Sequence, residues 1–103
     1  MQATVLTTTG KALSKLPASV IVEPTWHVGG TALSLTLRNE RNAATLRNAA
    51  RENGAPLDWE PEVFAQGDDA SDLAAEYGIS EDWPEPFRLD TWTFAHLCGY
   101  CDN

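Results

Sequence analysis

The first third of the chain carries the hydrophobic pattern of β-strands. Residues 4–8 and 19–23 are short runs rich in β-branched side chains, and a turn signal or a proline follows each run. Beyond a glycine pair, Leu33, Leu35 and Leu37 alternate with polar residues, which is the period of a half-buried strand. A helix is the alternative, because Leu33 and Leu37 also stand four positions apart. We favour the strand.

One clear helix follows these strands. Asn42 is a favourable N-cap residue, and Gly54 suits the left-handed position that commonly follows the end of a helix. The apolar residues between them recur on one helical face and are Ala43, Leu46, Ala49 and Ala50. We therefore predict one amphipathic helix between Asn42 and Gly54.

Proline and glycine divide the second half of the chain into short elements. Residues 58–64 favour the opening of a helix that a glycine closes, and residues 69–77 favour a second helix. Asp90 is placed to cap a third helix over residues 91–98. Residues 87–89, just before that cap, favour a short strand.

These elements predict an α+β fold in a single domain, residues 1–103. We expect a small antiparallel sheet from the N-terminal third, packed with one longer helix and several short acidic helices. Apolar residues make up 43% of the chain and include four tryptophans, which argues against intrinsic disorder. No apolar run exceeds three residues, so no segment is long enough to span a bilayer. The first residues lack the pattern of a signal peptide, and we expect a cytoplasmic protein.

Charge divides the chain into two unlike halves. The formal net charge is −8, but residues 1–53 hold six Lys or Arg and three acidic residues, a sum of +3. Residues 54–103 hold twelve acidic residues and one cation, Arg88, a sum of −11. This balance argues against direct binding of nucleic acid through a broad basic surface and against docking on anionic membranes. It favours a basic protein as the partner.

The acidic residues gather on one predicted helix and on the loops that flank it. Asp69, Asp72 and Glu76 recur at i, i+3 and i+7 and therefore share one face of that helix. An exposed Trp59 or Trp83 would supply the aromatic anchor that protein interfaces favour. The predicted partner-binding residues are Asp58, Trp59, Glu60, Glu62, Asp68, Asp69, Asp72, Glu76, Glu81, Asp82, Trp83 and Glu85.

A hydrated face without a partner is the alternative explanation of this acidity. The helix macrodipole favours acidic residues at helix starts, and a soluble protein needs a charged surface. The arginines of the first half, among them Arg47 and Arg51, can also neutralise part of the acidic half. Carboxylates this close together repel one another, and that cost weighs toward an interface in which a partner relieves it.

Residues 72–80 resemble the first helix and turn of a helix-turn-helix DNA-binding motif. Gly78 stands at the turn, Ile79 is the apolar residue that packs inward, and Ser80 would start the recognition helix. Residues 81–86 carry two prolines and several carboxylates, which disrupt a helix and repel phosphates. We therefore predict an ordinary glycine-terminated helix end here.

The C-terminal residues His96, Cys98 and Cys101 form a His-x-Cys-x-x-Cys cluster. It supplies three ligands of the kind that zinc prefers, whereas a structural zinc site needs four. We expect no cofactor and keep zinc as the alternative. We also expect no enzymatic activity, because neither His27 nor His96 lies in a recognisable nucleophile motif.

These patterns favour a small acidic binding protein as the function. We expect an inhibitor that acts as a DNA mimic and occupies the basic, nucleic-acid-binding surface of a partner protein. Small phage or mobile-element proteins of the anti-defence type, such as anti-CRISPR proteins, have this size and charge. Two alternatives stay open: a zinc-binding or structural accessory protein organised by the C-terminal cluster, and an immunity protein or antitoxin for a cationic toxin. The oligomeric state is not predicted.

Overall fold

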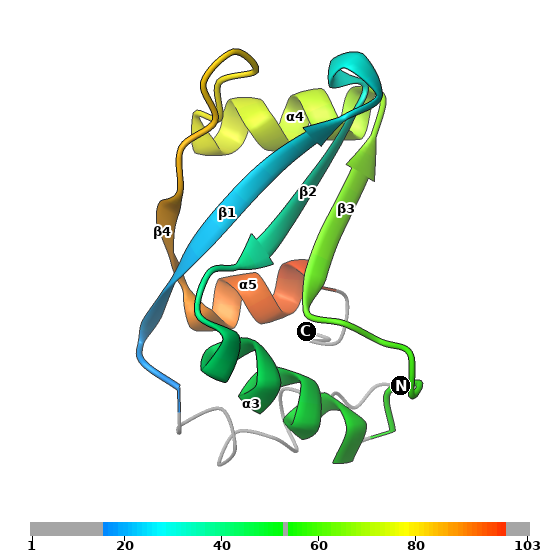
Figure 1. The fold of residues 1–103 in the computed structure, drawn as a ribbon, viewed down its shortest axis with the longest axis vertical. Helices are drawn as coiled ribbons and strands as arrows, with labels where there is room; N and C mark the ends of the chain where they lie inside the picture. The colour runs from blue at the N-terminus through cyan, green and yellow to red at the C-terminus, as the bar shows by residue number, and fades with distance from the viewer. Residues whose placement is uncertain (1–15, 53, 99–103) are drawn as a thin grey trace.

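The computed structural model describes residues 16–52 and 54–98, which form an α+β fold (Figure 1). Four strands make one antiparallel sheet in the order β3-β2-β1-β4. The strands are β1 (Ser19–His27), β2 (Ala32–Leu37), β3 (Glu62–Gln66) and β4 (Phe87–Asp90), and the short 3-10 turn η1 (Val28–Gly30) joins the first two. The helices are α3 (Glu40–Glu52), α4 (Asp68–Tyr77) and α5 (Thr91–Leu97). The predicted α+β class is confirmed, and the predicted strand at residues 4–8 lies outside the described residues.

One face of the sheet carries the hydrophobic core. The register pairs Val22 with Leu37 and Pro24 with Leu35, so these buried side chains lie on the same face. All three helices contribute buried residues to this core, α4 toward one end of the sheet and α3 and α5 toward the other (Figure 1). Phe94 of α5 is fully buried within it, and burial of a side chain of this size stabilises a fold by about 1.5–3 kcal/mol.

The opposite face of the sheet is polar and partly open. Thr25 and His27 are exposed there, and Phe64 on the edge strand is 56% exposed. His27 Nε2 lies 2.9 Å from Ser34 Oγ, and the His27 and Phe64 ring centroids are 6.1 Å apart. These larger side chains cover Ser34, which is therefore buried. The alternation in β2 thus reflects two different faces, and the strand prediction for residues 33–37 is confirmed.

The prediction of a helix opening at residues 58–64 was wrong. This segment forms a loop and then β3, which pairs with β2 along its whole length. Val63 is buried while Glu62 and Phe64 are exposed, so the alternation has the period of a strand. Proline at position 61 immediately precedes the strand. The sheet is therefore completed by two strands from the second half, β3 and the predicted β4, beside the N-terminal ones.

The longer helix, α3, begins earlier than its pattern predicts. Asn39 Oδ1 accepts hydrogen bonds from the backbone N–H groups of Arg41 at 2.9 Å and Asn42 at 3.1 Å. Asn39, rather than Asn42, is therefore the residue whose side chain caps the helix. The buried residues of α3 are those predicted: Ala43, Leu46, Ala49 and Ala50.

Helices α4 and α5 and strand β4 form where the sequence predicts them. Gly78 ends α4 with a φ of +66°, and the Ile79 N–H donates to the Ala74 carbonyl at 2.9 Å, a typical glycine-terminated helix end. Asp90 caps α5 by accepting a hydrogen bond from a backbone N–H of its first turn. Residues 79–86 form a loop, so the resemblance to a helix-turn-helix stops at the turn. Within the described ranges, no helix has the length and hydrophobicity needed to cross a membrane.

Candidate binding surface

The predicted partner-binding residues lie at two ends of the sheet. β3 runs between these ends: it begins near α3 with Glu62, and α4 follows after a single glycine at the other end (Figure 1). The group near α3 is Asp58, Trp59, Glu60 and Glu62. The other group, which we call the α4 acidic surface, consists of Asp68, Asp69, Asp72, Glu76, Glu81, Asp82 and Glu85, and Trp83 lies in the same loop as its last three members.

Glu60, in the group near α3, is paired within the protein. Its Oε1 lies 2.8 Å from Arg47 Nη2 and accepts a hydrogen bond from Arg47 Nε at 2.9 Å. Its Oε2 lies 3.5 Å from Arg51 Nη2, which also donates to the Trp59 carbonyl at 3.4 Å. Two arginines of α3 thus hold the loop before β3. The charge of Glu60 is therefore neutralised by arginines of the first half of the chain, as the alternative explanation of the acidity expects.

The seven carboxylates of the α4 acidic surface are all exposed. On α4 itself, Asp69, Asp72 and Glu76 face away from the core, while Ala70 on the other side is buried. Residues 68–86 contain no Lys, Arg or His. None of the seven carboxylates forms an ion pair with another residue of the described ranges. Unlike Glu60, these charges are not compensated by the described part of the chain.

Local helix stability explains only part of this arrangement. Asp68 and Asp69 occupy the first turn of α4, where the helix macrodipole favours each carboxylate by about 0.3–1 kcal/mol. Glu76 lies in the last turn, where the same dipole disfavours a negative charge. Asp72 and Glu76 are also four residues apart and repel each other. The acidic face continues along the whole helix, against these local costs.

The loop between α4 and β4 is held against the β1–β2 turn. Trp26 of β1 donates a hydrogen bond from Nε1 to the Ser80 carbonyl at 3.1 Å. Ser80 Oγ in turn accepts a hydrogen bond from the Trp83 backbone N–H at 3.0 Å, which closes a tight turn. Gly30 lies so close to Glu81 that a Cβ at position 30 would collide with the carboxylate. The loop is therefore anchored to β1 at Ser80 and packs against Gly30 at Glu81.

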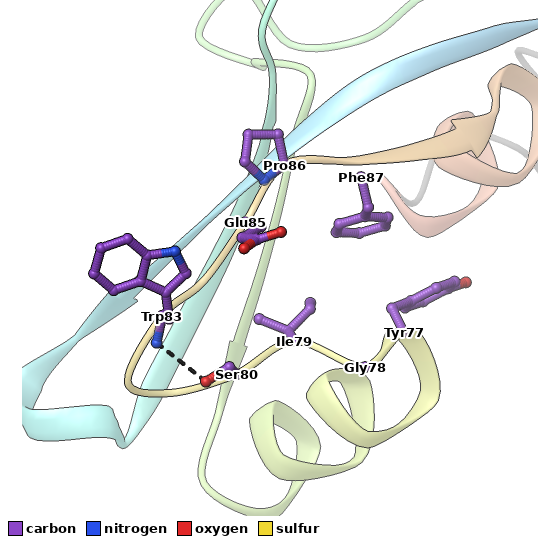
Figure 2. A pocket seen from close by; sticks show the side chains of 8 residues that line it. All are labelled: Tyr77, Gly78, Ile79, Ser80, Trp83, Glu85, Pro86 and Phe87. Atoms are coloured by element: carbon purple, nitrogen blue, oxygen red, sulfur yellow. Dashed lines mark hydrogen bonds between the residues drawn. The ribbon is translucent and has the colours of Figure 1, made fainter.

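A pocket with a volume of about 410 Å³ opens between the end of α4 and this loop (Figure 2). Tyr77 and Phe87 form one wall as a stacked pair, with ring centroids 5.6 Å apart and ring planes inclined by 18°. The Trp83 indole lies on the opposite side, and Glu85 and the buried Ile79 lie between the two (Figure 2). The arrangement brings three aromatic rings and one carboxylate to a single cavity.

Trp83 and Trp59, the two predicted anchors, have different environments. Trp83 is 74% exposed, whereas Trp59 is half-buried and packs against the core. Sequence reasoning missed the other walls of the pocket, because Tyr77 lies on the core-facing side of its helix and Phe87 opens a strand. The available signal was the close spacing of three aromatic residues around two prolines.

The C-terminal cluster lies only partly within the described residues. His96 belongs to α5 and Cys98 follows the end of that helix, whereas Cys101 lies outside the described ranges. Burial, and secondarily the Glu62 carboxylate, raise the pKa of the Cys98 thiol to about 12. Zinc binds the thiolate, so this environment disfavours a ligand role. Among the described residues, no three His, Cys, Asp or Glu side chains are grouped to hold a metal ion.

No protein-family model, curated protein or solved structure matches this chain. The features of this chain that bear on function are therefore the geometry and charge of the α4 acidic surface and the pocket beside it.

Proposed function

We propose that this protein is a small, non-enzymatic binding protein whose α4 acidic surface docks on a cationic surface of another protein. The observation that supports this most strongly is the set of seven exposed carboxylates in a stretch without any basic residue. Concentrated charge of one sign steers association with an oppositely charged partner and suppresses binding to acidic ones. Trp83 is exposed in the loop that carries three of these carboxylates, and it supplies an aromatic anchor.

We further propose that the partner's surface is one that otherwise binds nucleic acid, so that docking inhibits the partner. Duplex DNA carries one negative charge per about 1.7 Å, so seven charges in line correspond to about 12 Å, or three to four base pairs. At 1.5 Å per residue, the ten residues of α4 span about 15 Å and carry four of these seven charges, and the loop after α4 carries the other three. The α4 acidic surface alone thus has the charge and length to occupy a short part of a nucleic-acid site.

This mechanism suits an anti-defence inhibitor from a phage or mobile element that acts in the cytoplasm. An immunity protein or antitoxin would use the same surface against a cationic toxin and would differ only in its target. Both share the requirement that the carboxylates of α4 pair with Lys and Arg of the partner. No described feature favours the zinc-binding alternative to the same degree.

Affinity capture from the native host tests this function. The wild-type protein and a variant carrying Asp69→Lys, Asp72→Lys and Glu76→Lys serve as paired baits. We expect the wild type to retain a basic, nucleic-acid-binding protein that duplex DNA displaces and that the variant does not retain. A partner retained equally by both baits, or one whose binding to nucleic acid is unaffected by the protein, would contradict the proposed function.

A further inference from the structure

The pocket beside the α4 acidic surface combines aromatic walls with a single carboxylate. Its lining includes Tyr77, Trp83, Phe87 and Glu85, and none of the described residues that line it is a Lys, Arg or His. We propose that this pocket receives one arginine side chain from the partner's cationic surface. This inference rests on the proposed function and names the contact that would make binding selective rather than merely electrostatic.

The aromatic rings are suited to a guanidinium group. The face of an aromatic ring attracts cations because its π-electrons make that face negative; Trp is the strongest such partner, and Arg is the cation found there more often. Trp83 is mostly exposed on one side of the pocket, and the stacked Tyr77 and Phe87 rings stand on the other (Figure 2). Because Tyr77 and Phe87 stack on each other, their faces are turned toward one another, and the exposed Trp83 indole supplies the ring face on which a planar guanidinium can stack.

Glu85 supplies the charge that completes this environment. Its carboxylate lies between Trp83 and the Tyr77–Phe87 wall (Figure 2), and it forms no ion pair with the described residues. A carboxylate and a guanidinium form two parallel, charge-assisted hydrogen bonds, which are among the stronger polar contacts in proteins. The neighbouring carboxylates of the α4 acidic surface extend the negative potential around the entrance.

The pocket is shaped before any ligand arrives. The Trp26–Ser80 and Ser80–Trp83 hydrogen bonds fix the loop on one side, and prolines restrict the backbone immediately before and after Glu85. A site held in its binding conformation loses less conformational entropy on association. Its volume of about 410 Å³ also falls within the range of roughly 300–1,000 Å³ usual for small-ligand pockets.

These features favour arginine over lysine. The lysine ammonium is a compact point charge that can neither stack flat on an indole nor form the paired hydrogen bonds of a guanidinium with one carboxylate. An electrostatic surface alone would treat two peptides of equal charge similarly. An arginine-selective pocket would therefore be detected as a higher affinity for an arginine peptide than for a lysine peptide of the same charge.

Titration calorimetry with octa-arginine and octa-lysine at the same ionic strength measures that difference. We expect the wild type to bind octa-arginine about tenfold more tightly, because lysine can form neither the flat stacking contact nor the paired hydrogen bonds of a guanidinium. Trp83→Ala and Glu85→Gln should each remove most of this preference, and Trp83→Phe should keep part of it. Trp92→Ala is the matched control, because Trp92 is 47% exposed on α5 and does not line the pocket.

The possible results distinguish failure of the arginine-pocket proposal from failure of the proposed function. A wild type that does not prefer octa-arginine, or a preference that survives both Trp83→Ala and Glu85→Gln, overturns the arginine pocket. If the wild type in that case still binds octa-lysine and the α4 triple variant does not, the proposed function stands without the pocket. Failure of the wild type to bind either peptide overturns both.

Discussion

At the scale of single residues, Glu60 and Glu85 are both exposed carboxylates next to prolines in loops that lead into edge strands. Glu60 lies within reach of two arginines of α3, whereas Glu85 faces three aromatic rings and no described cation. The first carboxylate therefore ties a loop to a helix, and the second remains available to a partner. Nothing in the local sequence distinguishes them, because the arginines come from a distant segment.

Cys98 carries a prediction at the same scale. In a Cys101→Ser variant, the remaining Cys98 thiol should react with iodoacetamide at pH 8 about a thousandfold more slowly than an unperturbed cysteine. The reason is that its pKa is raised from 9.0 to about 12 and only the thiolate reacts. Alkylation rates followed by mass spectrometry measure this directly.

The same pKa shift predicts how stability depends on pH. A group whose pKa is raised by folding stabilises the folded state fully below its unfolded pKa and loses that contribution as pH rises toward its folded pKa. The free energy of unfolding should therefore fall between about pH 9 and pH 12, and Cys98→Ala should remove part of this fall. Alkylation of Cys98 at the rate of a free cysteine would contradict both expectations.

At the scale of elements, β3 shows why short segments are difficult to predict. An acidic residue and a proline near position 60 favour a helix start, yet the five residues after them alternate between exposed and buried in β3. The decisive contribution is pairing with β2, which lies about 30 residues earlier in the chain. Segments such as β2 and α3 are predictable because their local pattern and their packing agree.

The N-terminus of α3 gives a prediction that separates two neighbouring asparagines. Asn39→Ala should lower the free energy of unfolding by about 1 kcal/mol, because it removes the side chain that accepts hydrogen bonds from two backbone N–H groups of the first turn. Asn42→Ala is the matched control and should cost far less, since alanine is a better helix former than asparagine inside a helix. Urea unfolding measures both.

Asn39→Ser should restore most of the stability, because serine is also a favourable cap. A larger loss for Asn42→Ala than for Asn39→Ala would show that the helix begins where its apolar pattern alone places it.

The sequence is enough to predict which acidic residues share the exposed face of α4. It is not enough to predict which residues of other elements lie beside that face. Helical spacing correctly indicates that Asp69, Asp72 and Glu76 share an exposed face, because that relation is internal to one helix. Their separation from Asp58 and Glu62 depends on the strand that runs between the two groups. The pocket at Trp83 depends in turn on how the loop folds back toward α4. Relations across elements are tertiary, and a single sequence carries little information about them.

At the scale of the whole molecule, acidity is uneven between the two ends of the sheet. Near α3, arginines pair with Glu60 and reduce the net charge, whereas the α4 acidic surface has no described ion pair. Such a molecule presents one strongly negative end to its surroundings and should orient itself toward a cationic partner before contact. The formal net charge of −8 does not by itself reveal this direction.

Two triple variants of equal net charge test whether the acidity of the protein acts through one directed surface. Asp69→Lys, Asp72→Lys and Glu76→Lys remove charge from the α4 acidic surface, and Glu52→Lys, Asp58→Lys and Glu62→Lys make the same change at exposed positions outside it. Each triple raises the net charge by six, from −8 to −2. Titration calorimetry with octa-lysine compares both with the wild type. We predict that the α4 triple loses binding while the other retains most of it, and equal affinities of the two triples would contradict a directed acidic surface.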